Sequence, residues 1–128
     1  MTFMLDTSVA IDLRDGVPEV REKAARLSGP VLISVIARVE LEGGLYRGLP
    51  DFERRRARLV ELLAPLPAPA FDDACAEAYR SIVEYAGYSR RKILDRMIAA
   101  QALVFDATLV TRNGDDFRDI PGLELLEW

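Results

Sequence analysis

The sequence predicts a single α/β domain in which a parallel β-sheet of about four to five strands is covered by helices on both faces. Short apolar runs, each the length of one strand, alternate with longer stretches whose apolar residues recur at helical spacing. The strand-like runs are continuously apolar, which is typical of parallel strands buried on both sides. No repeat or linker divides the chain, so we expect one domain over residues 1–128.

The beginning of the chain is expected to form a strand and two helices. Residues 2–5 read as a short buried strand, and Asp6 provides the cap of a helix that ends near Gly16. Pro18 suits the first turn of a second helix, because proline lacks a backbone N–H and the N–H groups of this turn have no partner within the helix. Residues 28–30, Ser-Gly-Pro, then form a turn.

The next segment repeats the strand–helix order. Residues 31–33 form the second strand, and Ser34 caps a helix that runs toward Leu41. Asp51 is expected to cap a further helix whose inward residues are apolar and whose arginines point mostly outward; the inward set is Phe52, Leu59, Leu62 and Leu63.

Three prolines within residues 65–69 rule out a central strand, because proline cannot donate to a strand ladder. A short edge strand within residues 66–71 is the most they permit. Asp72 begins the helix that follows, and the lone cysteine, Cys75, lies on its apolar face as a core residue.

The last third is expected to supply one helix and two strands. Ser89 caps a helix over residues 90–105, and residues 107–111 form a buried strand. A turn at residues 112–114 follows, and residues 123–126 form the last strand.

Composition excludes several kinds of site. The chain has no histidine, which excludes Ser-His-Asp and Cys-His catalysis and the usual zinc sites, and one cysteine allows no internal disulfide. Any enzymatic chemistry must therefore rest on carboxylates, hydroxyls and a hard cation. The start of the chain lacks a basic signal region, and no run nears the roughly 18–20 apolar residues of a membrane span, so we expect a cytoplasmic protein.

Acidic residues end or interrupt apolar runs at four places: Asp6, Glu40, Asp95 and the pair Asp115-Asp116. A carboxylate near an apolar interior is costly unless it is paired or holds a cation. The carboxyl ends of parallel strands meet at one edge of a sheet, so these residues can converge there. Oxygen ligands without histidine or cysteine favour Mg²⁺, or Mn²⁺ in its place, and metal-assisted phosphodiester hydrolysis is the natural reaction class.

The basic residues are uneven. A net charge of −4 argues against a purely electrostatic nucleic-acid binder. One arginine cluster, at residues 54–58, is equally well explained as a solvated helix face. A second cluster lies beside Asp95 and could contact an RNA backbone; it consists of Arg90, Arg91, Lys92 and Arg96.

Several motifs occur in a recognisable order along nearly the whole chain: Met4-Leu5-Asp6-Thr7-Ser8, Ile33-Ser34-Val35 through Glu40-Leu41, Leu94-Asp95-Arg96-Met97-Ile98-Ala99-Ala100-Gln101-Ala102-Leu103, Leu109-Val110-Thr111-Arg112-Asn113 through Asp116-Phe117, and the ending Ile120-Pro121-Gly122-Leu123 through Trp128. This pattern resembles the PIN-domain ribonucleases and, within them, the VapC toxins of bacterial type II toxin–antitoxin systems.

The resemblance implies a Mg²⁺-dependent endoribonuclease with Asp6, Glu40 and Asp95 as its acidic core. Residues that would orient the ligands or the attacking water are Thr7 or Ser8, Thr111 and Asn113. The family pattern leaves the fourth acid open. Asp116 is favoured because it directly precedes Phe117, with Asp115 second and Asn113 as a further alternative.

The resemblance also implies a homodimer, an RNA substrate and a cognate VapB-type antitoxin whose C-terminal segment covers the active-site groove. Alternatives are a catalytically silent PIN fold and a receiver-like binding module. A receiver domain needs a lysine after a strand, whereas Lys23 and Lys92 both fall in expected helices. A dehalogenase-type phosphatase needs a second aspartate two residues after Asp6, where this chain has Ser8.

Overall fold

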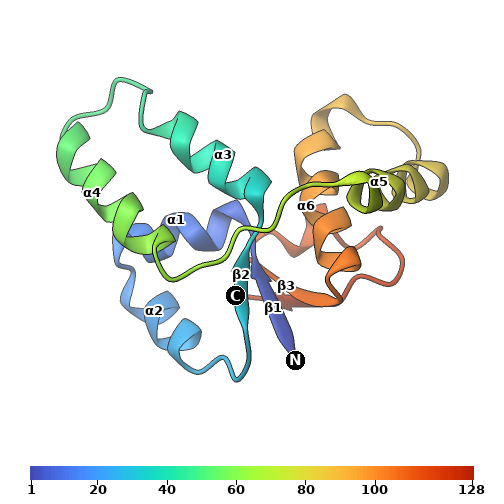
Figure 1. Cartoon of the computed structure of the whole chain (residues 1–128), viewed down its shortest axis with the longest axis horizontal. Helices are drawn as coiled ribbons and strands as arrows, with labels where there is room; N and C mark the ends of the chain where they lie inside the picture. The colour runs from blue at the N-terminus through green and yellow to red at the C-terminus, as the bar shows by residue number, and fades with distance from the viewer.

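An all-parallel, four-stranded sheet in the order β2-β1-β3-β4 forms the centre of the protein, which a computed structural model describes over residues 1–128 (Figure 1). Leu5 pairs with Ile33 on one side and with Val110 on the other, so the carboxyl ends of the first three strands lie at one edge. The strands are β1 (Thr2–Leu5), β2 (Val31–Ile33), β3 (Ala107–Thr111) and β4 (Leu125–Glu127).

The helices gather in two groups on either side of the sheet (Figure 1). One group contains α1 (Thr7–Asp15), α2 (Pro18–Ala25), α3 (Val35–Gly44) and α4 (Phe52–Leu63), and the other contains α5 (Asp73–Ala86) and α6 (Ile93–Val104). There are also two single 3₁₀ turns. The first, η1 (Arg90–Lys92), directly precedes α6, and the second, η2 (Gly114–Asp116), follows β3. None of these helices is both long and apolar enough to cross a membrane.

Both faces of the sheet are buried, because successive strand residues point to opposite sides. Met4 and Leu109 belong to a core cluster with Ile98 of α6. Leu5, on the opposite face, packs in a cluster with Val9 of α1. The predicted α/β fold, a parallel sheet covered on both faces, is therefore confirmed.

The helix caps expected at the ends of β1 and β2 are present. Asp6 Oδ1 accepts a hydrogen bond from the Val9 amide at 3.2 Å, and Ser34 Oγ accepts one from the Ile36 amide at 3.1 Å. Each cap starts its helix directly after a strand. It thereby places the first turns of α1 and α3 at the carboxyl edge of the sheet.

Two predicted features are wrong. No strand forms within residues 66–71; Ile33 N donates a single hydrogen bond to Pro67 O at 2.9 Å, and the prolines supply no further donors. Asp51 precedes α4 but makes no side-chain cap, because its backbone is left-handed with φ 61°. The extended segment after α4 crosses the β2 edge without extending the sheet.

Two boundaries differ from the prediction. The helix expected over residues 90–105 is divided into η1 and α6, and Ser89 makes no side-chain cap hydrogen bond. The last strand begins at Leu125, because the segment before it first turns at Gly122, whose φ is 78°. Both shifts lie at element ends, where local signals are weakest.

Candidate active site

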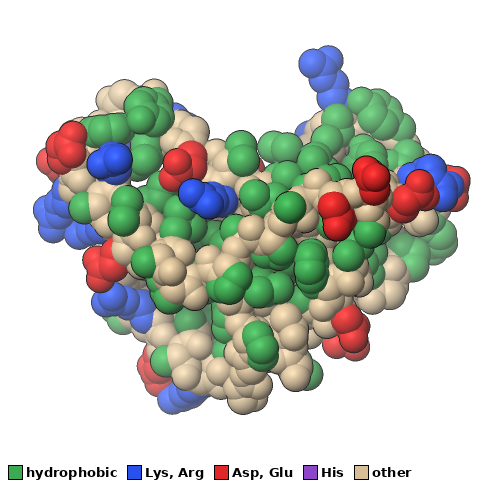
Figure 2. All heavy atoms as spheres, in the orientation of Figure 1, with side chains coloured by type: hydrophobic (Ala, Val, Ile, Leu, Met, Phe, Trp, Pro, Cys, Tyr) green, Lys and Arg blue, Asp and Glu red, His purple; other side chains and the backbone are tan.

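The carboxyl edge of the sheet opens into a hollow between the α3–α4 side and the α5–α6 side of the molecule. The space-filling view shows this depression at the top of the molecule, between the two groups of helices (Figure 2). We call it the acidic hollow, because it is formed around Asp6, Glu40, Asp95 and Asp116.

Asp6 is the most firmly held of these acids. Its side chain is buried, and Oδ1 accepts hydrogen bonds from Ser8 Oγ at 2.6 Å and from Val9 N at 3.2 Å. Its other oxygen, Oδ2, accepts from Thr111 Oγ1 at 2.5 Å. Hydroxyl groups from α1 and β3 therefore fix the carboxylate without neutralising its charge.

The same two hydroxyls also fix the loop that follows β3. Ser8 Oγ accepts a hydrogen bond from Arg112 N at 3.1 Å, and Thr111 Oγ1 accepts one from Asn113 N at 2.9 Å. Asn113 contributes only its backbone to this network, and the residue is exposed. Ser8 and Thr111 thus position Asp6 and the β3 loop together.

Glu40 reaches the hollow from α3. Thr7 Oγ1 donates a hydrogen bond of 2.6 Å to Glu40 Oε1, although the two residues are 33 positions apart. Glu40 is partly buried, whereas its neighbour Glu42 is exposed. A single acid of this pair therefore faces the site, as the helical spacing requires.

Asp95 lies in the first turn of α6, and its pKa is affected by the charges of all three other acids. Its pKa is raised to about 6, first by burial and then by the negative charges of Asp116, Glu40 and Asp6, in that order of size. Lys92 is the cation that opposes this rise. None of the four acids forms an ion pair, so the hollow holds concentrated negative charge.

The donor set fits a hard cation in its chemistry. Carboxylate and hydroxyl oxygens are the ligands that Mg²⁺ and Mn²⁺ prefer, and no nitrogen or sulfur ligand competes. No three of the four acids lie close enough together to ligate one ion directly. Mg²⁺ usually keeps several waters and takes one or two carboxylates, so the arrangement fits an ion held partly through water.

The two adjacent aspartates of η2 have different surroundings. The Asp115 side chain is 90% exposed and forms an ion pair with Arg118. Asp116 has no ion pair, and its charge acts on Asp95. Gly114 lets η2 lie against β4, since a Cβ there would come within 2.2 Å of Glu127 Oε2. Both aspartates are exposed, and of the two only Asp116 contributes to the raised pKa of Asp95.

The basic cluster next to Asp95 is only partly available to a ligand. Arg90 and Arg91 are exposed and form no ion pair, while Lys92 Nζ lies 3.5 Å from Asp119. Arg96 is 3% exposed, and its Nη1 donates to Gly87 O at 2.5 Å. The expectation that Arg96 contacts an RNA backbone is therefore corrected, because its guanidinium is turned into the protein.

One charged residue beside the site was missed by reasoning from sequence. Asp12 is 7% exposed, and its Oδ2 lies 2.9 Å from Arg112 Nη1. Asp12 therefore anchors the residue that follows Thr111. The available signal was its spacing, because Asp12 lies one helical turn after Ser8 and on the same face of α1.

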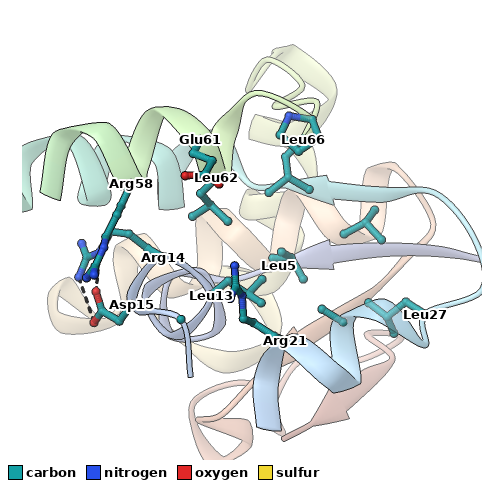
Figure 3. A pocket seen from close by; sticks show the side chains of 14 residues that line it. Leu5, Leu13, Arg14, Asp15, Arg21, Leu27, Arg58, Glu61, Leu62 and Leu66 are labelled. Atoms are coloured by element: carbon teal, nitrogen blue, oxygen red, sulfur yellow. Dashed lines mark hydrogen bonds and ion pairs between the residues drawn. The ribbon is translucent and has the colours of Figure 1, made fainter. Parts of the chain in front are cut away.

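A second concave surface lies away from the acidic hollow, between α1, α2 and α4. It is a cavity of about 520 Å³, and none of the four acids lines it (Figure 3). Its floor is apolar and includes Leu13, Leu27, Leu62 and Leu66. Three arginines, Arg14, Arg21 and Arg58, lie at its border, and Arg14 pairs with Asp15 at 3.0 Å. We call it the arginine-rimmed cavity.

Comparison with known proteins identifies the family. The family model described as the PIN domain matches residues 3–123. Ribonuclease VapC2 of Rickettsia felis is 29% identical over 134 residues, which cover 100% of this chain and 98% of that relative.

Solved structures show the same architecture. VapBC2 from Rickettsia felis, bound to a DNA fragment from its promoter, matches with a TM-score of 0.87 and 26% identity over 100% of this chain and 99% of that chain. DNA-bound VapBC from Salmonella typhimurium matches with a TM-score of 0.86 and 28% identity over 100% and 98%. The chain therefore belongs to the PIN-domain family and, within it, is a relative of the VapC ribonucleases.

Proposed function

We propose that this chain is a divalent-metal-dependent endoribonuclease that acts as the toxin of a type II toxin–antitoxin system. The observation that carries the proposal is the concentration of four unpaired carboxylates in one hollow, with Asp6 held by two hydroxyls. Its similarity to the Rickettsia felis ribonuclease supports RNA as the substrate.

Mg²⁺, or Mn²⁺ in its place, would be held by Asp6 and Asp95 with Glu40 and Asp116, directly or through water. When bound, such an ion lowers the pKa of a bound water and offsets charge on a phosphoryl oxygen. The protein's contribution is to keep the carboxylates fixed around the hollow.

The remaining polar groups have separate positioning roles. Ser8 and Thr111 hold both oxygens of Asp6, and Thr7 holds Glu40 Oε1. The second oxygen of Glu40 makes no hydrogen bond within the chain, so it can accept one from a water beside the scissile phosphate. Asn113 and Asp115 are assigned no direct part.

The RNA backbone would be contacted by Arg90 and Arg91, with Lys92 closer to the acids. Both arginines are exposed and free of carboxylate partners. Planar guanidinium groups bind phosphate oxygens in a bidentate manner. Because the overall charge is −4, local contacts of this kind must offset repulsion between the acidic protein and RNA.

A cognate VapB-type antitoxin is the proposed protein partner, supported by the similarity to VapBC complexes. The arginine-rimmed cavity offers an apolar floor beside cationic side chains, which suits an amphipathic, acidic segment of such a partner. A homodimer, implied by the resemblance, stays a prediction that light scattering of the purified chain would test.

The test of the activity is cleavage of a labelled panel of structured RNAs with Mg²⁺ and with EDTA. Asp6→Asn and Asp95→Asn should abolish cleavage. Asp106→Asn is a matched control, because Asp106 is exposed and asparagine tolerates its positive φ of 48°. Cleavage that survives EDTA or both substitutions would contradict the proposal. Hydrolysis of a phosphorylated small molecule with no RNA cleavage would favour a phosphatase instead.

The test of the partner site is co-purification with the co-expressed antitoxin. Arg21→Glu together with Arg58→Glu should weaken capture, because both reverse the charge at the border of the cavity. Arg54→Glu is the matched control, since this exposed arginine of α4 does not line the cavity. Equal loss of capture in the control would contradict the assignment. Undiminished capture in the double variant would do the same.

A further inference from the structure

The most completely bonded buried polar side chain outside the acidic hollow is Gln101 of α6. It has no exposed surface. Its Oε1 accepts hydrogen bonds from Ser34 Oγ at 2.7 Å and from Val35 N at 3.2 Å, and its Nε2 donates to Pro69 O at 2.8 Å. One amide thus joins three segments that are far apart in sequence.

These hydrogen bonds connect α6 with the start of α3, and the two helices belong to the two groups on either side of the sheet (Figure 1). Asp95 precedes Gln101 on α6 by fewer than two helical turns, and Glu40 follows Val35 on α3 by a similar length. The amide therefore fixes the start of α3 against the last turn of α6. Each helix bears one of the acids of the hollow, Glu40 on α3 and Asp95 on α6.

The third partner ties the junction to the segment that crosses the sheet edge. Pro69 lies in the extended stretch between α4 and α5, and its carbonyl accepts from the Gln101 amide. Ser34 Oγ is shared, since it also accepts the cap hydrogen bond from Ile36 N at 3.1 Å. Displacement of Gln101 would therefore disturb the first turn of α3.

We infer that Gln101 is a positioning residue, which acts through Ser34 and Val35 to hold Glu40 of α3 and Asp95 of α6 at a fixed separation for cation binding. This inference rests on the proposed function for its consequence in catalysis. The placement of the two helices can be measured independently of any activity.

The chemistry of the junction requires an amide of this length. Glutamine places one acceptor and one donor at the end of the same side chain. Methionine is equally long and apolar, but it would leave the Val35 amide, the Ser34 hydroxyl and the Pro69 carbonyl without their buried partner. Glutamic acid keeps the acceptor oxygen, and a buried carboxyl that takes up a proton can donate to Pro69 as well.

The first measurement is the distance between two nitroxide labels, one at Glu42 on α3 and one at Leu94 on α6. Both residues are exposed, and Cys75, which is buried, is replaced by alanine in every variant. Gln101→Met should broaden or shift the distance distribution, and Gln101→Glu should restore most of it. Asp72→Ala is the matched control, because it removes the α5 cap from Cys75 N without touching the junction. An unchanged distribution in Gln101→Met would overturn the inference.

The second measurement is Mn²⁺ binding by calorimetry, with Mn²⁺ alone as the probe. Gln101→Met should weaken binding by about tenfold, because Glu40 and Asp95 would no longer be held at one separation; this is the low end of the loss seen when groups that orient metal ligands are removed. Asp72→Ala should bind as the wild type does. Should Gln101→Met fail to fold, Ser34→Ala removes one of its three hydrogen bonds and should shift both readouts in the same direction. Wild-type values in Ser34→Ala would then contradict the inference.

The two measurements separate this inference from the proposed function. If wild-type protein binds Mn²⁺ but cleaves no RNA, the proposed function fails while the positioning role stands on the distances and on Mn²⁺ affinity. If wild type cleaves RNA and Gln101→Met shows unchanged distances and affinity, the positioning role fails while the proposed function stands.

Discussion

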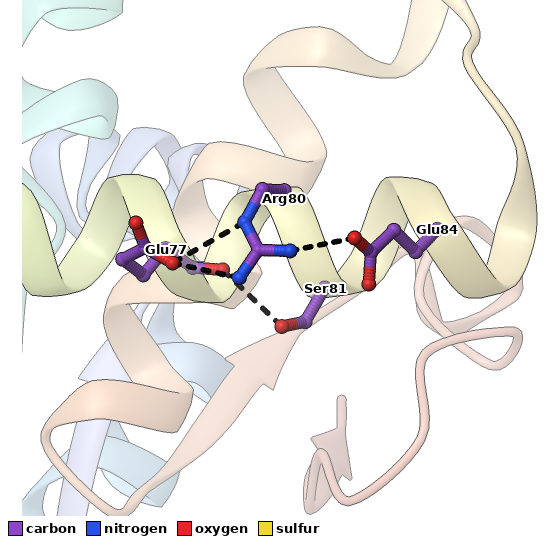
Figure 4. Close-up of polar contacts among 4 residues, drawn as sticks. All are labelled: Glu77, Arg80, Ser81 and Glu84. Atoms are coloured by element: carbon purple, nitrogen blue, oxygen red, sulfur yellow. Dashed lines mark hydrogen bonds and ion pairs between the residues drawn. The ribbon is translucent and has the colours of Figure 1, made fainter.

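The carboxylates on the outer face of α5 and those of the acidic hollow are the same chemical group in opposite situations. On α5, Glu77 and Glu84 flank Arg80 at 2.8 and 2.6 Å, and all three side chains are at least 60% exposed (Figure 4). Each negative charge there has a guanidinium and water beside it. Such pairs contribute little to stability, because water already solvates both partners.

In the acidic hollow, Asp6 and Glu40 accept hydrogen bonds from hydroxyls and from one backbone amide, and none of the four acids forms an ion pair with an arginine. Asp6 is bound by Ser8 and Thr111, and the pKa of Asp95 rises to about 6 because burial and the neighbouring carboxylates disfavour its charge. Seventeen residues of the chain are basic, and all of them except Lys23 and Lys92 are arginines. Fifteen arginines were therefore available to neutralise this charge. None of them pairs with the four acids, and we propose that a cation offsets this charge.

The largest expected effect comes from removing the best-held acid. Asp6→Asn should reduce RNA cleavage by at least about a hundredfold, the scale of losing a group that acts directly on the reacting atoms. The fold should survive, because the amide oxygen can still accept from Ser8 and Val9. Initial cleavage rates and circular dichroism measure the two effects. Cleavage near the wild-type rate in a folded variant would remove Asp6 from the site.

A smaller effect distinguishes the two acids of η2. Asp116→Asn should lower cleavage by about tenfold, a typical loss for an outer ligand of a metal. It should also lower the pKa of Asp95, because the Asp116 charge is the largest of the three that raise it. Asp115→Asn should change neither quantity, since its carboxylate pairs with Arg118 on the surface. If Asp115→Asn lowered cleavage and Asp116→Asn did not, Asp115 would be the acid of the site in place of Asp116.

The pH dependence of stability is expected to be modest. The folded pKa of Asp95 is raised from 3.8 to about 6, so the folded chain binds this proton more tightly than the unfolded chain. The resulting stability is fully present below 3.8 and is lost as the pH rises through about 6. Because Asp95 is only half buried, screening reduces the contribution to about 1 kcal/mol.

Thermal unfolding at a series of pH values measures this contribution. Asp95→Asn should remove the decline between those two pH values. In the wild type, Mg²⁺ should raise the melting temperature by a few degrees above the Asp95 pKa and much less below it. A melting temperature that Mg²⁺ leaves unchanged at neutral pH would contradict a cation site.

The smallest effect is expected on α5. Arg80→Ala should leave both the melting temperature and RNA cleavage almost unchanged, because Glu77 and Glu84 remain solvated when their partner is lost. Differential scanning fluorimetry and the cleavage assay measure this pair of outcomes. A large loss of stability would mean that the ion pairs of Arg80 stabilise the fold more than exposed pairs usually do.

The placement of Asp6 follows from local sequence, because an acid directly after a buried strand must lie at the sheet edge and can cap the next helix. The convergence of Glu40 and Asp95 on that edge follows from the parallel order of the strands. These inferences need only the alternation of strands and helices. The fold and the candidate acids were therefore accessible without a structure.

The orientation of Arg96 was not accessible in this way. Its position beside Asp95 suggests a basic surface, but its partners are the Gly87 carbonyl and Asp119, which lie on separate segments. Gln101 is similar, since its bonds reach Ser34 and Pro69 across 67 and 32 positions. The arginine-rimmed cavity also depends on how three helices pack. Such contacts are set by tertiary packing, which periodicity does not specify.

The most direct test of the central claim is the pKa of the Asp95 carboxyl, measured by NMR of its carboxyl carbon with and without saturating Mg²⁺. Without the ion, we expect a pKa of about 6, because burial and the unneutralised carboxylates around Asp95 both disfavour its charge. With Mg²⁺ the pKa should fall well below that value, since a bound cation offsets the same charges. A pKa that stays near 6 under both conditions would contradict the claim that these acids form one cation site.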